Sequence, residues 1–391
     1  MIESIYVGMT GLSSFSRGLR VIANNTTNLN TPGFKSSSLR FADAFYDGGS
    51  YSGRQFGQLG YGVSTTGTMM SFKSGELRQT GNGLDLAIDG QGLFTLKGEG
   101  DRIRYTRAGQ FQFNSDGVLV SQGNGAKVMG IGADGALSEI SIANLKTSAG
   151  KATAVVKFTG NLSSGGTEQS VSGVRVFDAA GGEHLLTAKL TNTNSTTPGS
   201  WQVELLDGTT TVGTQQLIFQ DGKPTAATAK LSFTYTPAGQ AAVPLTLDFS
   251  ADVTSFASGS LSTLAFASQD GFAAAELSSA SFDSTGTLVL TYANGQTVKG
   301  SRLSLGRFDT TDAVGAVGNN EFEVLDGNAW HTGVAGGSFG SVRSGYVEIS
   351  NVDLSQEFSD LVIMQRGYQA SSQVISTANE MLQELFSMKS R

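Results

Sequence analysis

Residues 353–391 read DLSQEFSDLVIMQRGYQASSQVISTANEMLQELFSMKSR, and the rest of the architecture can be worked out from them. The stretch contains one glycine and no proline, although the chain of 391 residues holds 52 glycines. A run of this length without helix breakers predicts a single long amphipathic helix. At about 1.5 Å per residue the helix would be roughly 50 Å long, longer than most helices inside a compact domain. We therefore expect it to need partners along its length.

The start of this predicted helix carries a capping signal. Asp353 can accept hydrogen bonds from the first free backbone amides of the helix. Gln356 follows three residues later and can reach back to the start, which would complete a capping box. The sequence therefore predicts a helix that begins next to Asp353.

Apolar residues recur along the helix at alternating spacings of four and three, which is the heptad pattern of a coiled coil. The apolar positions of this predicted assembly seam are Leu354, Phe358, Leu361, Tyr368, Ile375, Leu382 and Phe386. Within the same series, every seventh position is polar, at Gln365, Ser372 and Asn379. We expect these polar residues to help fix the register at some cost in stability.

A second helix is predicted at the other end of the chain, in residues 1–30. Its apolar positions repeat the same alternation and add Ile5, Met9, Leu12 and Leu19 to the seam. Pro32 and Gly33 mark where this helix must have ended. Gly8, Gly11 and Gly18 each cost an isolated helix about 1 kcal/mol relative to alanine. We therefore expect the ends to be frayed in the free monomer and to become stable only by packing against other helices.

Two arrangements would supply that packing. The two terminal helices could form an antiparallel hairpin on the body of their own chain. Alternatively, both ends could pack against other copies of the chain, as paired heptad seams in a coiled-coil-like stem would do.

Composition excludes several classes of protein. The net charge is −7 and no lysine or arginine cluster is interleaved with aromatic residues, which argues against a nucleic-acid surface. The absence of cysteine removes thiol catalysis, thiolate metal sites and disulfides together. Glu3 stands where a secretory signal would carry positive charge, and we expect neither a cleaved signal peptide nor a membrane span. If the protein leaves the cell, another route carries it.

Between the predicted helices the apolar period changes to two, which is typical of β-strands. Residues 71–145 alternate in this way around glycine turns, and residues 113–120 resemble residues 282–289 as a strand, a polar turn and a strand. We therefore expect an inner β-domain made of 71–145 and 271–352, with 31–70 as a connector. Residues 146–270 hold four of the five prolines and read as an inserted outer β-domain. Strands are expected at 171–177, 185–190, 201–206 and 231–235. The expected fold class is α+β, mainly β, with two nested β-domains.

Candidate chemistry is sparse. His184 and His331 lie far apart in sequence without a neighbouring acid at metal spacing, so surface roles are favoured over ligand or base roles. The turn Asn114–Gly117 lacks the acidic ligands of a calcium loop. Asp85 and Asp89 share one face of a strand, but no second pair or aromatic-lined cleft can be inferred. The sequence predicts no catalytic residue, no cofactor and no metal, and therefore no enzyme.

Four stretches carry a resemblance to a known family. Residues 23–35 (ANNTTNLNTPGFK), 84–94 (LDLAIDGQGLF), 350–354 (SNVDL) and 365–370 (QRGYQA) resemble, in order, the signatures of the bacterial flagellar rod and hook family. The family-motif residues are Asn24, Asn25, Asn28, Gly33, Phe34, Lys35, Asn351 and Asp353. From the residues alone, Asn24, Asn25 and Asn28 are better explained as caps at a helix end than as contacts between subunits.

The resemblance implies a structural subunit rather than a catalyst. A chain of this length with an inserted outer domain is similar to the subunit of the hook, a curved tube that self-assembles outside the cell and transmits motor torque from rod to filament. The resemblance implies export in unfolded form through the flagellar type III apparatus. Its implied partners are copies of itself, the hook cap, the distal rod and the hook–filament junction proteins, with no nucleic acid and no membrane insertion.

The family also implies an order of layers. The terminal helices, residues 1–30 and 353–391, would form the inner layer of the tube, and the β-domains would form the outer shells. Three alternatives stay open: a distal rod subunit of the same family, a secreted adhesin-like binding module, and a secreted surface enzyme such as a glycosidase. An adhesin would keep its function without the terminal helices, whereas loss of these helices should remove the function of this chain.

Overall fold

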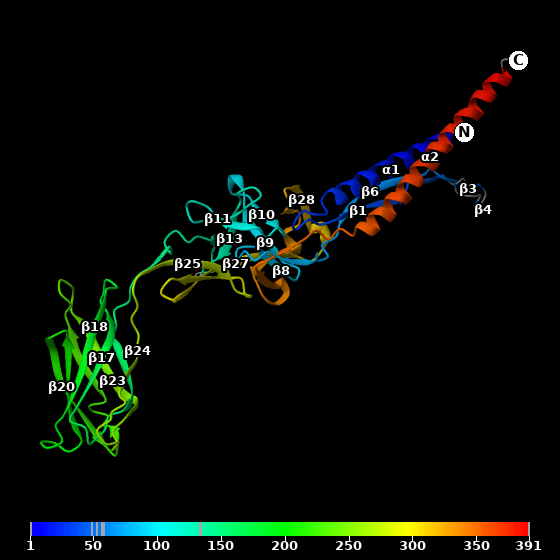
Figure 1. Ribbon diagram of the computed structural model, residues 1–391. Helices are drawn as coiled ribbons and strands as arrows, with labels where there is room; N and C mark the ends of the chain where they lie inside the picture. Colours follow the sequence, from blue (N-terminus) through cyan, green and yellow to red (C-terminus); the bar gives the residue numbers. More distant parts are fainter. Residues whose placement is uncertain (1, 48–49, 52–53, 56–58, 133–134, 390–391) are drawn as a thin grey trace. The chain divides into compact units, whose positions relative to one another are not determined.

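The computed structural model describes residues 2–47, 50–51, 54–55, 59–132 and 135–389. The chain divides into two compact units. Unit 1 comprises Met1–Ala143, Ala280–Leu290 and Val298–Arg391, and unit 2 comprises Asn144–Ser279 and Thr291–Thr297. Two long helices stand at the ends of the chain and strands occupy most of the rest, so the expected mainly β fold class is confirmed (Figure 1).

Helices α1 (Ile2–Thr27) and α2 (Leu354–Lys389) lie side by side in unit 1 (Figure 1). Gly8 lies against Ile375, whereas Gly18, further along α1, lies against the earlier residue Met364 of α2. The two helices therefore run antiparallel. Within the single chain the two helices therefore form the antiparallel hairpin. The coiled-coil geometry expected for the stem stays a prediction.

Glycines form the face of α1 that contacts α2. A Cβ atom at Gly8 would lie 2.7 Å from Ile375 Cγ1, one at Gly11 2.6 Å from Ser371 Oγ, and one at Gly18 2.8 Å from Met364 Sδ. Real Cβ atoms essentially never come this close, so a side chain at any of these positions would force Ile375, Ser371 or Met364 to move. The glycines that weaken α1 as an isolated helix are therefore its packing surface in the folded chain.

Gly11→Val is expected to separate the two helices even though valine suits a helix better than glycine does. The new side chain would overlap Ser371, and overpacking of this kind costs about 1–3 kcal/mol. Hydrogen exchange of the α1 backbone amides should become faster. Ser13→Val, at an exposed position of the same helix, is the control and should leave the exchange of α1 unchanged.

A hairpin occupies much of the stretch that was expected to be a connector. Strands β1 (Ser37–Asp43) and β6 (Val63–Met70) pair antiparallel beside α1. Ser14 donates to the carbonyl of Val63 at 3.5 Å, and Phe15 of α1 packs against Phe41 of β1 with ring centroids 5.8 Å apart. Short strands lie between them: β2 (Tyr46–Asp47), β3 (Ser50–Tyr51), β4 (Arg54–Gln55) and β5 (Leu59–Gly60).

The remaining strands of unit 1 surround a core that includes Leu86, Phe94, Phe111 and Leu119, all fully buried. These strands are β7 (Leu77–Gln79), β8 (Leu86–Asp89), β9 (Leu93–Lys97), β10 (Ile103–Thr106), β11 (Phe111–Phe113), β12 (Leu119–Ser121), β13 (Lys127–Ile131), β14 (Leu137–Glu139), β28 (Val314–Gly318), β29 (Glu321–Val324), β30 (Trp330–Val334), β31 (Ser341–Ser344) and β32 (Tyr346–Glu348). Three more cross a unit boundary along the sequence: β25 (Ala275–Phe282), β26 (Thr287–Tyr292) and β27 (Thr297–Phe308).

The two similar segments seen in the sequence form the same turn. The Asn114 side chain accepts from the amide of Val118 at 2.8 Å, and the Asp283 side chain accepts from the amide of Thr287 at 3.0 Å. Gly117 and Gly286 have φ values of 77° and 70°, which are left-handed and favour glycine. The prediction of a strand, a polar turn and a strand is confirmed at both places, and Asn114–Gly117 is a hairpin turn.

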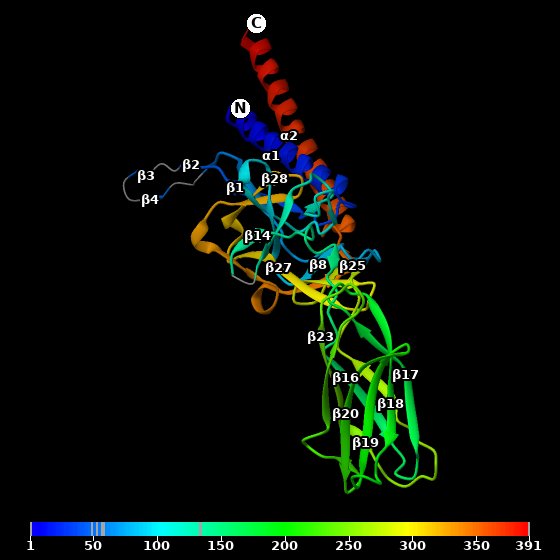
Figure 2. The same cartoon turned by 90° about the vertical axis from the view of Figure 1, so that its left-hand side faces the viewer.

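Unit 2 is built from two sheets packed on one core (Figure 2). One sheet has the order β17-β18-β19-β20-β21 and the other the order β22-β23-β16-β24. The strands are β15 (Thr147–Ser148), β16 (Val155–Asn161), β17 (Glu168–Phe177), β18 (Glu183–Asn192), β19 (Ser200–Asp207), β20 (Thr210–Gln220), β21 (Lys223–Pro224), β22 (Lys230–Tyr235), β23 (Val243–Thr254) and β24 (Ala265–Gln269). All four strands expected in this region are present, because each alternates buried apolar with exposed polar residues.

Candidate functional site

Asp353 caps α2 as the sequence indicates. Its Oδ1 accepts from the amides of Ser355 at 2.9 Å and Gln356 at 3.2 Å. The other half of the expected capping box is wrong, because the Gln356 side chain donates forward to Asp360 Oδ1 at 3.0 Å. A helix-surface contact between residues four apart competes with the reach back to the cap.

Two of the three motif asparagines at the end of α1 have different roles. Asn28 is a helix cap, since its side chain donates to the carbonyl of Asn24 at 2.9 Å. Asn25 is a buried crosslink rather than a cap. Its Nδ2 donates to the carbonyl of Ser37 at 2.7 Å and to Glu357 Oε1 at 2.8 Å, and its Oδ1 accepts from the amide of Ser37 at 3.0 Å. One side chain therefore joins α1, β1 and α2.

Glu357, the partner of Asn25 on α2, has a raised pKa because burial disfavours its charged form, an effect that the Asn25 hydrogen bond partly opposes. The folded chain therefore keeps this proton at pH values where the unfolded chain has lost it. Stability should fall as pH rises from 4.5 through the raised pKa.

Glu357→Gln should remove that dependence, because glutamine can still accept from Asn25 but does not ionise. The free energy of unfolding, measured in urea from pH 4 to 8, should fall less with rising pH in the variant than in the unaltered chain. A difference between the two proteins that does not change with pH would contradict the proposed role of Glu357.

Beneath the helices lies a buried ionic cluster. Lys35 Nζ lies 2.6 Å from Glu348 Oε1, and Arg107 Nη1 lies 3.2 Å from Glu348 Oε2, with all three side chains almost inaccessible. The amide of Gly75 also donates to Glu348 at 2.7 Å, and the carbonyl of Lys73 accepts from Lys35 at 2.8 Å. Burial lowers the pKa of Lys35 and of Arg107, while the charge of Glu348 opposes this in both.

The other motif residues surround this cluster. Gly33 has a φ of 72°, and a Cβ there would lie 2.4 Å from the amide nitrogen of Ala108. The carbonyl of Phe34 accepts from the amide of Asn351 at 3.4 Å. Asn351 Oδ1 accepts from the amide of Ser36 at 2.7 Å, and its Nδ2 donates to the carbonyl of Ser71 at 2.7 Å. The motifs therefore tie both ends of the chain to the β-strands where the helices begin and end.

Sequence reasoning missed Glu348 and Arg107. Glu348 occupies an inward position of a strand in which its neighbour Val347 is also buried. A carboxylate among apolar residues two positions before the SNVDL motif could have indicated a buried partner for Lys35.

The structure divides the predicted seam between two surfaces. Half-buried positions are Ile5, Leu12, Leu19, Leu361, Ile375 and Leu382. Exposed positions are Met9, Leu354, Phe358, Gln365, Tyr368, Ser372, Asn379 and Phe386. Ile375 contacts α1, whereas Phe358 and Phe386 are 56% and 69% exposed. The heptad positions thus do not share one face of the folded chain, because the glycine stripe sets the contact between the helices.

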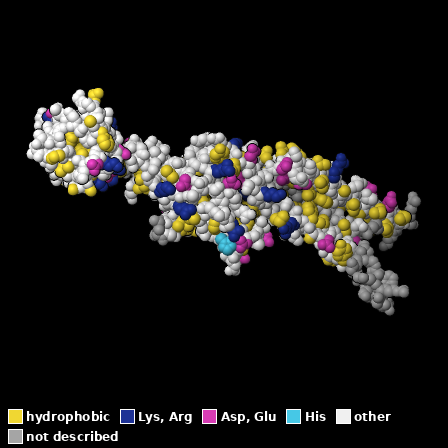
Figure 3. All heavy atoms as spheres, turned by 90° about the horizontal axis from the view of Figure 1, so that it is seen from below, with side chains coloured by type: hydrophobic (Ala, Val, Ile, Leu, Met, Phe, Trp, Pro, Cys, Tyr) yellow, Lys and Arg dark blue, Asp and Glu magenta, His cyan; other side chains and the backbone are white. Residues whose placement is uncertain are grey.

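Further apolar side chains that were not part of the predicted seam are also exposed on α2. Val362 and Ile363 are 54% and 60% exposed, and Met381, Leu385 and Met388 are 45%, 48% and 72% exposed. On the face drawn in Figure 3, hydrophobic side chains are densest towards the right-hand end, where Figure 1 places the terminal helices. Apolar surface of this extent is typical of an interface with another protein.

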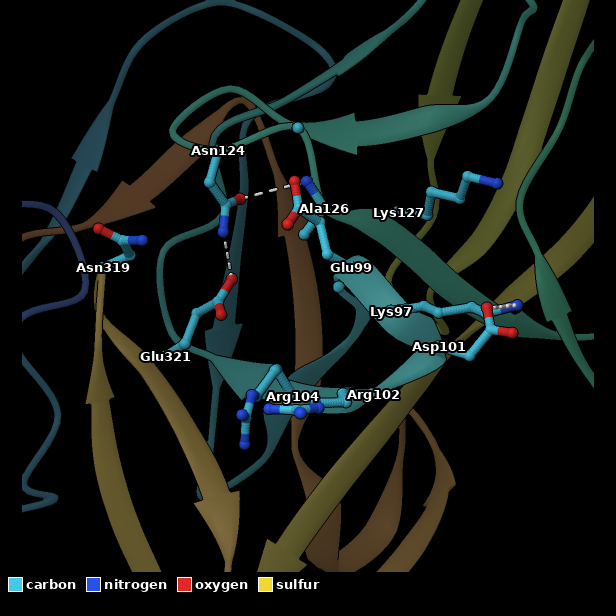
Figure 4. Close-up of a pocket in the computed structure, with 12 residues that line it drawn as sticks. Lys97, Glu99, Asp101, Arg102, Arg104, Asn124, Ala126, Lys127, Asn319 and Glu321 are labelled. Atoms are coloured by element: carbon cyan, nitrogen blue, oxygen red, sulfur yellow. Dashed lines mark hydrogen bonds and ion pairs between the residues drawn. The ribbon is translucent and has the colours of Figure 1, made fainter.

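A charged pocket lies in the β-strands of unit 1 (Figure 4). Lys97 pairs with Asp101 at 2.8 Å, and Asn124 donates to Glu321 at 2.6 Å. Its charged groups thus largely neutralise each other, and its lining contains no histidine, serine or threonine that could serve as base or nucleophile.

The two histidines pair with carboxylates at the surface of their strands. His184 Nε2 lies 2.9 Å from Asp178 Oδ2, and His331 Nε2 lies 2.8 Å from Asp309 Oδ2. Each pairing lowers the pKa of its aspartate.

Asp89, considered with Asp85 as a carboxylate pair, instead forms an ion pair with Arg343 at 2.7 Å. Within the described residues, no group of acidic or histidine side chains is placed to hold a metal ion. None of the described helices combines the length and apolar character that crossing a membrane requires.

Three family models match the segments that build this region. Residues 5–35 match "Flagella basal body rod protein", residues 87–163 match "Flagellar hook protein FlgE/F/G D1 domain", and residues 343–388 match "Flagellar basal body rod FlgEFG protein C-terminal". The matched segments include most of α1, the family-motif residues at both ends of the chain, the β-strands around Arg107 and most of α2.

Relatives match over nearly the whole chain. The flagellar hook protein FlgE of Escherichia coli is 28% identical over 97% of this chain and 98% of that protein, and that of Borreliella burgdorferi is 27% identical over 100% of both. The flagellar basal-body rod protein FlgG of Bacillus subtilis is 26% identical over 100% of both. The crystal structure of Helicobacter pylori flagellar hook protein FlgE2 shares the fold, with a TM-score of 0.53 and 14% identity over 69% of this chain and 100% of that one. The chain therefore belongs to the flagellar hook and rod protein family, and three of these four relatives are hook proteins.

Proposed function

We propose that this chain assembles into the flagellar hook through the exposed apolar residues of its terminal helices. The hook is an extracellular part of the flagellum and a universal joint, and the chain is its structural subunit. The observation that carries the proposal is the row of exposed apolar side chains on α2, which includes Phe358, Ile363 and Leu385. Burying each of them between copies would contribute roughly 1.5–3 kcal/mol.

The buried ionic cluster supports assembly because it holds the two helices in place at the point where they join the β-strands. Asn25 and the group of Lys35, Glu348 and Arg107 connect residues from both ends of the chain. A helix that transmits force needs a rigid attachment, because a loose joint would dissipate the force in local bending. We infer that this cluster passes load from the helical layer to the β-domains.

For the assembled tube we propose four functional parts. These are a helical layer (1–30 and 353–391), a connector (31–70), an inner β-domain (71–145 and 271–352) and an outer β-domain (146–270). In a bending tube each subunit must lengthen and shorten once per turn. Apolar contacts between helices would hold the subunits together, while polar contacts between outer domains slide. The same proposal includes no catalytic activity and no cofactor.

The further partners are also proposals. As a hook subunit the chain would be exported unfolded by the flagellar type III apparatus, would polymerise beneath a hook cap, and would join the distal rod to the hook–filament junction proteins. The full-length similarity to a rod protein keeps a distal rod subunit as the second candidate.

Electron microscopy of cells that make a tagged form of the chain separates these candidates. A tag along a short curved tube outside the cell is the expected result. A tag on a straight segment inside the envelope would mean a rod subunit, and the absence of any tagged tube would overturn the assembly proposal.

A further inference from the structure

A groove runs between α1 and the β1–β6 hairpin, on a side of α1 that α2 does not occupy. Arg17, Arg20 and Val21 line it from the helix, and Leu39 and Thr68 line it from the strands. Its cavity volume is about 550 Å³. Arg20 lies on the opposite side of α1 from Gly18 and Ile22, which are buried, because residues two apart on a helix do not share a face. The groove is therefore open to a partner while the intrachain helix pair stays intact.

The groove is positively charged. Arg17 donates to the hydroxyl of Thr65 at 2.7 Å, and Arg20 has no ion-pair partner among the described residues. No acidic side chain lines the groove. Two guanidinium groups next to Val21 and Leu39 fit a partner that carries carboxylates beside apolar side chains.

The end of α2 has this chemistry and lacks a partner on its own chain. Gly8 lies opposite Ile375, so in the antiparallel pair Ile2 lies opposite about residue 381, since both helices rise about 1.5 Å per residue. α2 continues to Lys389. Its last turns present exposed Met381 and Leu385 next to exposed Glu380 and Glu384. Glu380 receives only a 3.5 Å hydrogen bond from Ser376, and Glu384 forms no ion pair with a described residue.

We propose that the exposed face of the end of α2, within residues 380–388, of one copy of this chain binds in the groove of a second copy. Glu380 and Glu384 pair with Arg17 and Arg20 there, while Met381 and Leu385 pack on Val21 and Leu39. Arg17 and Arg20 are separated by about 4.5 Å along their helix axis and Glu380 and Glu384 by about 6 Å, a difference that the long arginine side chains can span. The inference rests on the proposed assembly and specifies which surfaces meet.

The contact is heterologous, because the groove and the helix end are different surfaces. Each copy offers one groove and one helix end, so binding leaves a free surface of each kind. Contacts of this type continue into rings or open helical polymers and do not stop at a dimer. This is the geometry that a growing tube requires.

Cysteine crosslinking tests the pairing directly, because the natural chain contains no cysteine. The variant Thr68→Cys/Leu385→Cys, made by the producer cells in place of the natural chain, should form disulfides between copies in isolated tubes. A ladder of dimers, trimers and larger species should appear on a non-reducing gel, and each single variant should stay monomeric. Dimers from Leu385→Cys alone, or intact tubes without a ladder from the double variant, would overturn the groove assignment.

A charge exchange gives an independent test. Arg17→Glu/Arg20→Glu and Glu380→Arg/Glu384→Arg should each reduce tube formation at least tenfold, and the chain with all four changes should regain it. If the variant with all four changes forms no tubes although the unaltered chain does, the proposed pairing of the two arginines with the two glutamates is wrong, but the proposed function is not. If the unaltered chain forms no tubes in these cells, the proposed function itself fails.

Discussion

Phe358→Asp/Ile363→Asp is expected to abolish tube formation while the monomer stays folded. Both side chains are more than half exposed, at 56% and 60%, so the variant loses little packing within its own chain. In the proposed polymer the same positions would be buried between copies, where an unpaired carboxylate costs several kcal/mol. Because every subunit repeats the defect, no tube should be visible by electron microscopy, while the circular dichroism of the monomer stays unchanged.

Ser359→Asp/Gln373→Asp is the matched control. It adds the same two charges at exposed polar positions of the same helix. Tubes formed by the control but not by the Phe358 and Ile363 variant would establish that lost apolar contacts matter. Loss of tubes in both variants would mean that added charge alone blocks assembly, and would contradict the role assigned to Phe358 and Ile363.

Glu348→Gln should destabilise unit 1 by about 3–5 kcal/mol, the range measured when one partner of a buried ion pair is removed. The change removes the carboxylate that lies against both Lys35 and Arg107 in a site that water does not reach. Glutamine cannot compensate two cations, although its shape is close to that of glutamate. Urea unfolding followed by hydrogen exchange should show an early transition in residues near α1 and β7, with unit 2 unaffected.

Asp89→Asn provides the comparison for Glu348→Gln. Its ion pair with Arg343 is 2.7 Å long, but both side chains are about half exposed. Exposed pairs contribute about 0–1 kcal/mol, so this variant should unfold close to the unaltered chain. Equal losses in the two variants would show that the cluster around Glu348 has no special structural importance.

Local patterns predicted the elements of this fold well. The Asp353 cap, the two similar turns and the four strands of unit 2 each depend on residues within a few positions of one another. Along β19, for example, Val203 and Leu205 are buried while Gln202 is exposed, as period-two alternation requires.

Long-range contacts could not be predicted in the same way. Lys35 and Glu348 are separated by 313 positions, and nothing local to either residue identifies the other. The face of α1 that contacts α2 within one chain also could not be read from apolar residues. Gly8, Gly11 and Gly18 contact α2 through the absence of a side chain, which a hydrophobic pattern does not record. Because the glycines form the contact between the helices, the larger side chains of Phe358 and Met9 stay exposed and can contact other copies.

A cryo-electron microscopy reconstruction of tubes isolated from cells that make this chain tests the central claim most directly. The account predicts that α1 and α2 form a continuous layer in which Phe358, Ile363 and Leu385 are buried between copies. A tube in which these side chains face solvent, with subunits joined only through unit 2, would contradict it.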